Sequence, residues 1–177
     1  VHRSKHHVEF APPHTTKRCT ADSTKPRRQI VKTLQFETVI AASPEKVWKT
    51  MLDKLTYEKW VDVAWPGSTY KGEWKQGAQI RFTGADDNGG IVSEVTHIDP
   101  YASVVVEHIA VILEDGTLDR DSDMAKDWIG STEAYTFTPE NGGTKVNVAI
   151  TTTPEWSSMF EDGWPKALDA LKQLAEQ

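Results

Sequence analysis

The sequence predicts an α+β domain in which a mostly antiparallel sheet of about seven strands packs against one long C-terminal helix. Three observations lead to this prediction. The middle of the chain is a series of strand-length segments separated by turn signals, the last twenty or so residues repeat apolar side chains at helical spacing, and no regular strand–helix–strand alternation occurs. The sequence contains no internal repeat.

Composition predicts one folded domain. A chain of 177 residues with 38% hydrophobic and 26% charged residues is ordinary for a single globular unit. No apolar run approaches the roughly 18 to 20 residues of a membrane span, and the start lacks an apolar signal-peptide core, so we expect a cytoplasmic protein. Cys19 is the only cysteine, which excludes an internal disulfide and a cysteine-based metal cage.

Residues 1–30 differ in kind from the remainder. They carry a net charge of +5 and the other residues −11, which together give the −6 of the whole chain. Low apolar content predicts a disordered basic leader, either appended to the natural chain or simply unstructured, with the domain at 31–177. A nucleic-acid arm, a transit peptide or a weak histidine site are the alternatives, and the acidic body argues against nucleic acid as the main partner. The leader histidines are His2, His6, His7 and His14.

The domain is expected to begin with a strand followed by two helices. The segment "IVKTLQFETVIAA" alternates apolar and polar residues over a strand length. A helix then starts at "SPEK", because Ser43 is a good N-cap residue and Pro44 suits the first helical position. Its apolar residues recur at helical spacing: Val47, Trp48, Met51, Leu52 and Leu55. A second short helix over residues 56–63 carries Trp60 and ends before the turn residues "WPGS".

Three hairpins are predicted in the middle of the chain. "STYKGEW" and "AQIRFTG" flank "KQG", while "GGIVSEVTHI" and "SVVVEHIAVIL" flank "DPYA". "STEAYTFTPE" and "TKVNVAITTT" flank "NGG", the strongest of the three signals because asparagine and glycine tolerate positive φ. With the first strand, these segments account for the expected sheet.

The last helix contains an apparent contradiction, since Gly163 and Pro165 interrupt an amphipathic pattern. Thr153 is its expected cap and Pro154 its first residue. On a helical wheel the apolar residues from Trp156 to Ala175 share one half with Gly163, whereas Pro165 lies at the centre of the other half. We therefore expect the proline to face solvent and bend the helix between about residues 161 and 165. The glycine is expected to face the sheet and leave room there.

The "DPYA" hairpin places two histidines on one face of the sheet. With symmetric pairing, His108 faces Ser93 and His97 faces Val104, about 13 Å apart and too distant to share a metal. The opposite face would pair Glu94 with Glu107, which is costly unless those side chains are solvated. We therefore expect the glutamate face to be outer and the histidine face inner, although a one-residue slip would reverse this.

The element order and three segments resemble the START-like, birch-pollen-allergen-like helix-grip superfamily. The segments are "TVIAASPEKVWKTM", "NGGTKVNVAITTTP" and "MFEDGWPKALDALKQL", and within the superfamily they look most like the branch named for the activator of the heat-shock protein 90 ATPase. The resemblance spans about residues 32–176. It implies a curved sheet that grips the last helix around an apolar cavity, which the superfamily uses for lipids, steroids and polyketides and occasionally for catalysis.

The resemblance leads to three functional hypotheses. The first is binding of a small hydrophobic or amphipathic ligand without a cofactor, the second is a co-chaperone-type interaction module, and the third is a cyclase or hydrolase with His97, His108 or Tyr135 as acid or base. We expect a monomer or weak dimer. Aromatic residues on a sheet are often core residues, but the same types line such cavities. The expected ligand-binding residues are Trp60, Trp65, Phe82, Val95, His97, Val106, His108, Tyr135, Phe137, Phe160, Gly163, Trp164 and Ala167.

Other motifs give no metal or catalytic site. Asp119, Asp121 and Asp123 have calcium-loop spacing, but the sixth position is Met124 and the twelfth is Gly130, so the pattern fails. Ser122 or Asp123 is better explained as the cap of a short helix that runs to Trp128. The sequence has no G-x-S-x-G elbow, and no histidine and carboxylate cluster has ligand spacing.

Overall fold

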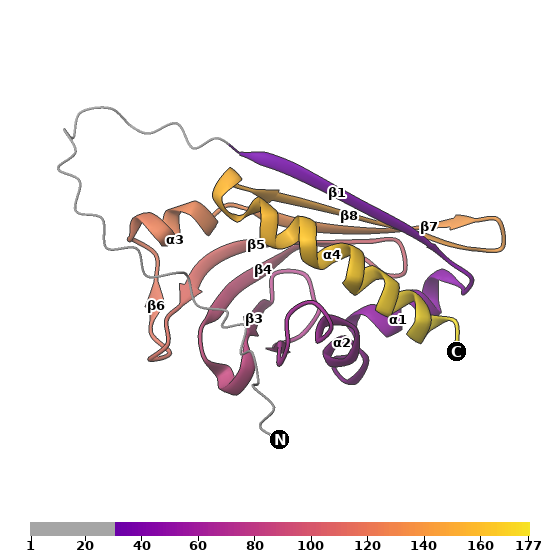
Figure 1. Cartoon of the computed structure of the whole chain (residues 1–177), viewed down its shortest axis with the longest axis horizontal. Coiled ribbons are helices and arrows are strands. Elements are labelled where there is room, and N and C mark those ends of the chain that lie inside the picture. Colours follow the sequence, from indigo (N-terminus) through magenta and orange to yellow (C-terminus); the bar gives the residue numbers. More distant parts are fainter. Residues whose placement is uncertain (1–30) are drawn as a thin grey trace, which may run out of the picture.

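The computed structural model describes residues 31–177, so our expectations for the leader, its four histidines and Cys19 lie outside the described residues. The described chain is an α+β domain (Figure 1), as predicted. Its elements in order are β1 (Lys32–Ile40), α1 (Pro44–Leu52), α2 (Lys54–Val61), β2 (Thr69–Lys71), β3 (Gln79–Thr83), η1 (Ala85–Asp87), β4 (Gly90–Asp99), β5 (Ser103–Ile112), β6 (Leu118–Asp119), α3 (Asp123–Trp128), β7 (Thr132–Glu140), β8 (Gly143–Thr152) and α4 (Pro154–Ala175).

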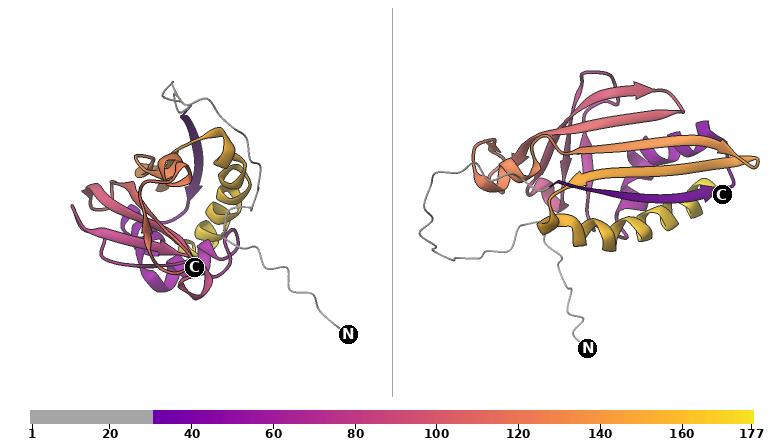
Figure 2. Two further views of the ribbon diagram at one scale, coloured as in Figure 1. Left: turned by 90° about the vertical axis from the view of Figure 1, so that its left-hand side faces the viewer. Right: turned by 90° about the horizontal axis from the view of Figure 1, so that it is seen from above.

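The strands form one antiparallel sheet in the order β1-β8-β7-β5-β4-β3-β2. An eighth strand, β6, pairs with β5 and was not predicted, because two residues are too short to show a period. The end-on view in Figure 2 shows the sheet curving around α4. The β7–β8 hairpin closes as expected, with Asn141 at φ 50° and Gly142 at φ 80°.

The short helices lie near the two ends of α4 (Figure 1), with α1 and α2 towards its C-terminal end and α3 near its start. The Ser43 side chain caps α1 by accepting a hydrogen bond from the Lys46 amide at 3.3 Å. The Ser122 side chain caps α3 by accepting one from the Ala125 amide at 3.0 Å, as the sequence predicts. Within residues 31–177 no helix is long and apolar enough to cross a membrane.

Helix α4 buries the face that the wheel predicts. Phe160, Gly163, Trp164, Ala167, Leu168 and Leu171 are buried, whereas Pro165 is exposed. The proline has no amide hydrogen, so the carbonyl of Glu161 lacks its helical donor on the solvent side. The helix is continuous from Pro154 to Ala175, and the bend near Pro165 stays a prediction.

The β4–β5 register confirms the predicted pairs at the centre of the hairpin and corrects the pairs on either side of it. Ser93 pairs with His108 and Glu94 with Glu107, but His97 pairs with Val105 rather than Val104. A bulge leaves Thr96 without a partner between Val95 and His97 and so reverses the alternation beyond it. His97 is therefore exposed on the outer face, where its Nε2 lies 3.0 Å from the Ser103 hydroxyl. The expectation that His97 faces inward is wrong.

Candidate functional site

Aromatic side chains occupy the space between α4 and the inner face of the sheet. Trp164 lies at their centre, 3% exposed. Its ring is within stacking or edge-to-face distance of rings from four other parts of the chain, namely β1, α2, the turn after α2 and β7. The ring centroids are 6.3 Å from Phe36, 5.9 Å from Trp60, 5.7 Å from Trp65 and 5.8 Å from Tyr135.

The space beside Gly163 is taken by Trp65. A Cβ atom added to Gly163 would lie 2.5 Å from Cζ2 of the Trp65 indole, far inside van der Waals contact. Trp65 belongs to the non-helical turn between α2 and β2 and is only half-buried. Gly163 therefore leaves room on the sheet side of α4, and the side chain of Trp65, which comes from a turn, fills that room.

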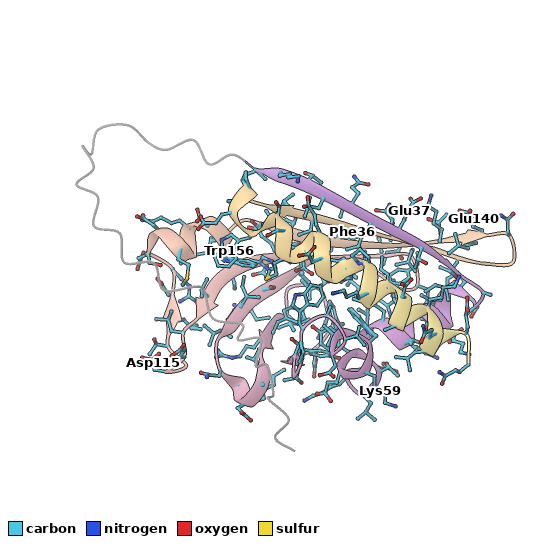
Figure 3. The ribbon with its side chains drawn as sticks, viewed as in Figure 1. Phe36, Glu37, Lys59, Asp115, Glu140 and Trp156 are labelled. Atoms are coloured by element: carbon cyan, nitrogen blue, oxygen red, sulfur yellow. The ribbon has the colours of Figure 1, made fainter. Side chains whose placement is uncertain are left out.

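A second aromatic group surrounds the start of α4. Trp128 of α3 lies 5.1 Å from Trp156, 6.0 Å from Phe160 and 5.9 Å from the His108 ring. Figure 3 shows Trp156 beside the first turns of α4, next to α3. The indole N–H groups of Trp156 and Trp164 are buried and have no hydrogen-bond acceptor in the structure. A buried donor without a partner costs about 1–3 kcal/mol, so a bound acceptor here would be favourable.

A row of four polar side chains crosses the inner face between these aromatic groups. The Ser93 hydroxyl lies 2.8 Å from Nδ1 of His108, and His108 Nε2 lies 3.7 Å from Oε1 of Glu133. The Tyr135 hydroxyl donates a hydrogen bond to the other oxygen of Glu133. Glu133 and Tyr135 are two residues apart on β7 and therefore share one face of the sheet. Glu133 pairs with the buried Val106 of β5, which places the row on the buried face.

Burial shifts the titration of this row. Desolvation lowers the pKa of His108 to about 4, so its imidazole is neutral near pH 7. Desolvation raises the pKa of Glu133, although the hydrogen bond from Tyr135 partly opposes the change. Burial and then the nearby Glu133 raise the pKa of Tyr135. The interior thus holds the ionisable carboxyl of Glu133, and its two polar partners, His108 and Tyr135, are neutral near pH 7.

The row contains the residue types of a serine–histidine–acid triad but not its arrangement. Ser93 is completely buried, which leaves its hydroxyl no access to a substrate carbonyl. The partly exposed member is Glu133, whose side chain is 18% exposed. The arrangement is therefore suited to holding a polar group at Glu133 and Tyr135, or to exchanging a proton there.

The structure brings most of the predicted ligand-binding residues to one interior. Except for His97, they are buried or packed against the core. Two surface hollows, of about 310 Å³ and 220 Å³, lie elsewhere. The first is beside α1 and the second beside the β7–β8 turn, and neither is lined by a predicted ligand-binding residue.

Sequence reasoning missed several residues of this interior. The predicted register sets Ser93 opposite His108 but assigns Ser93 no role. Glu133 is not among the predicted site residues, although it shares a face of β7 with Tyr135 and Phe137. That two-residue spacing was the available signal. Trp156 lies on the apolar half of the α4 wheel, but no local pattern pairs it with Trp128, because only the tertiary fold brings α3 against α4.

Residues 41–176 match the model of the family "Activator of Hsp90 ATPase homolog 1-like protein". The chain belongs to this family. The resemblance to the activator branch of the helix-grip superfamily is thereby confirmed, and the family match covers all of the helices and all of the strands except β1. No match was found among the curated proteins.

Solved structures similar to this Hsp90-activator-like domain share its fold at low identity. Protein MLL2253 from Mesorhizobium loti is 20% identical with a TM-score of 0.63, over 81% of this chain and 96% of that one. The Aha1 dimer from Colwellia psychrerythraea is 20% identical with a TM-score of 0.63, over 82% of this chain and 96% of that one. DynU16, a protein in the dynemicin biosynthetic locus, is 16% identical with a TM-score of 0.56, over 82% of this chain and 47% of that one. These likenesses show the fold.

Proposed function

We propose that this protein binds a small amphipathic molecule, of lipid, sterol or polyketide type, between α4 and the inner face of the sheet. The polar end of the molecule contacts Glu133 and Tyr135, and its apolar body lies among the aromatic rings around Trp164. The helix-grip fold that the family match indicates commonly binds ligands in a cavity. The location of DynU16 in a biosynthetic locus also supports a small-molecule role.

The observation that carries the proposal is the buried polar row. An ionisable carboxyl in an apolar interior costs several kcal/mol unless it is neutralised or paired, and an apolar side chain at Glu133 would avoid this cost. A few convergent polar groups with shifted pKa values in an apolar interior are typical of binding sites. The unpartnered indole N–H groups of Trp156 and Trp164 add two donors that a ligand would satisfy.

Access is expected at Trp65. Its indole covers Gly163 from a turn, and the turn contains Pro66 and Gly67, the latter at φ 79°. Movement of one side chain on a turn requires no rearrangement of the sheet, and turns open at lower free-energy cost than sheet strands. Outward rotation of Trp65 would free the volume next to Trp164 for the ligand.

Native mass spectrometry of protein purified from cells tests this function. We expect a stoichiometric small-molecule adduct that is lost on denaturation. Glu133→Gln is expected to lower the occupancy, whereas Glu107→Gln, which removes a carboxylate from the outer face of the same sheet, serves as the matched control. Polypeptide of bare mass in every preparation would contradict the proposal.

The second candidate function is interaction with a heat-shock chaperone, which the family description favours. The same purification distinguishes it from ligand binding. A chaperone that co-purifies reproducibly with protein of bare mass would support the interaction module and overturn the ligand proposal.

A further inference from the structure

We propose that the polar end of the bound molecule is a protonated amine that pairs with the Glu133 carboxylate. This inference rests on the proposed function and deepens it, because it names the chemical class of the ligand. It draws on the partners of Glu133, on the aromatic rings around them and on the charge of the domain.

The partners of Glu133 are one hydrogen-bond donor and one neutral imidazole. Tyr135 donates one hydrogen bond to Oε2, and the imidazole of His108 is 3.7 Å from Oε1, beyond hydrogen-bond distance. His108 is neutral near pH 7 because burial lowers its pKa to about 4. A carboxylate accepts several hydrogen bonds, so Glu133 retains capacity for a strong donor. A cationic donor would also offset the cost of keeping the carboxylate charged in the interior.

Aromatic rings surround those partners. The Tyr135 ring is 5.8 Å from Trp164, and the His108 ring is 5.9 Å from Trp128. Burial, and after it the nearby Glu133, raises the pKa of the Tyr57 phenol, so a third ring lies in the electrostatic neighbourhood of Glu133. Ammonium groups are attracted to the faces of tryptophan and tyrosine rings. A carboxylate among such rings is therefore well suited to a primary or methylated amine.

The charges of the site and of the domain disfavour an anionic head group on the ligand. An anionic head group would face Glu133 in a low-dielectric interior, where like charges repel strongly. The described residues 31–177 carry a net charge of −11, which attracts cations to the domain and repels anions. A neutral hydroxyl group could donate to Glu133 but would not offset the burial that disfavours its charged form.

A matched set of probes tests the inference by isothermal titration calorimetry at neutral pH. Naphthylethylamine, naphthylethanol and naphthylacetate share an aromatic body and differ in head group. We expect the wild-type protein to bind the amine about tenfold or more tightly than the alcohol, the range of a charge-assisted hydrogen bond, and the carboxylate most weakly. Glu133→Gln should remove this preference by weakening amine binding about tenfold, while Glu107→Gln should preserve it.

The outcomes separate the inference from the proposed function. Equal affinity for amine and alcohol, or tightest binding of the carboxylate, would overturn the amine assignment and leave ligand binding standing. Binding of none of the probes, together with an adduct of the purified protein, would likewise overturn only the amine assignment. Binding of none, with no adduct, would overturn both. Because the wild-type comparison needs no variant, the test stands even where Glu133→Gln fails to fold.

Discussion

Replacement of Gly163 by leucine is expected to lower the free energy of unfolding by about 1–3 kcal/mol, the range for an overpacked core. Even the first added atom, Cβ, would lie 2.5 Å from the Trp65 indole. Leucine is a better helix former than glycine by roughly 0.8 kcal/mol, so helix propensity alone predicts the opposite sign. The loss would therefore report the contact with Trp65. Urea unfolding followed by circular dichroism measures it.

Two control substitutions test whether the loss comes from the contact between position 163 and Trp65. Trp65→Ala in the Gly163→Leu background should recover much of the loss, with a coupling energy of about 0.5–3 kcal/mol in a double-mutant cycle. Lys166→Leu, at an exposed position of α4, should change stability by no more than about 0.5 kcal/mol. Additive effects of the Gly163 and Trp65 substitutions would show that the two residues do not share one space in solution.

Acidification is expected to destabilise the protein through His108. Burial lowers the pKa of His108 to about 4 in the folded state, against 6.5 for the unfolded chain. The unfolded state then binds more protons between these two values, so stability is fully present above pH 6.5 and falls as the pH decreases towards 4. Between pH 7.5 and 5 the contribution of His108 amounts to about 2 kcal/mol.

The measurement compares urea unfolding at the two pH values for three proteins. His108→Gln should lose about 2 kcal/mol less than wild type on acidification. His97→Gln, at an exposed position of the same sheet, serves as the control substitution. The raised pKa of Glu133 acts in the other direction, since the folded state then holds its proton to higher pH, but Glu133 is present in all three proteins. An equal loss in His108→Gln and wild type would contradict the burial of a neutral imidazole.

The fold could be predicted from sequence because its signals are local and strong. The "NGG" turn, the caps at Ser43 and Ser122 and the wheel of α4 each specify an element through short-range chemistry. The β4–β5 register was correct at Ser93 and His108 for the same reason. It failed at His97 because the unpaired Thr96 is a bulge, and one extra residue reverses every side chain beyond it.

The candidate site was only half predictable. Trp164, Gly163 and His108 follow from periodicity, since each lies on the apolar side of its element. The role of Trp65 depends on a turn that folds back against α4, and the polar row depends on three strands meeting in register. Such contacts join residues distant in sequence, so no local pattern records them. Glu133 is the exception, because its spacing of two residues from Tyr135 in the sequence predicts that both side chains share one face of β7.

The central claim is that a small amphipathic molecule binds between α4 and the sheet. The most direct test is a titration of ¹⁵N-labelled protein with naphthylethylamine and naphthylethanol, followed at the tryptophan indole resonances. Binding in the grip predicts that the Trp156 and Trp164 N–H signals shift most, because both rings lie in the proposed site. Shifts confined to the backbone around the hollow beside α1, at Ser43 and Lys49, with Trp164 unchanged, would contradict the account.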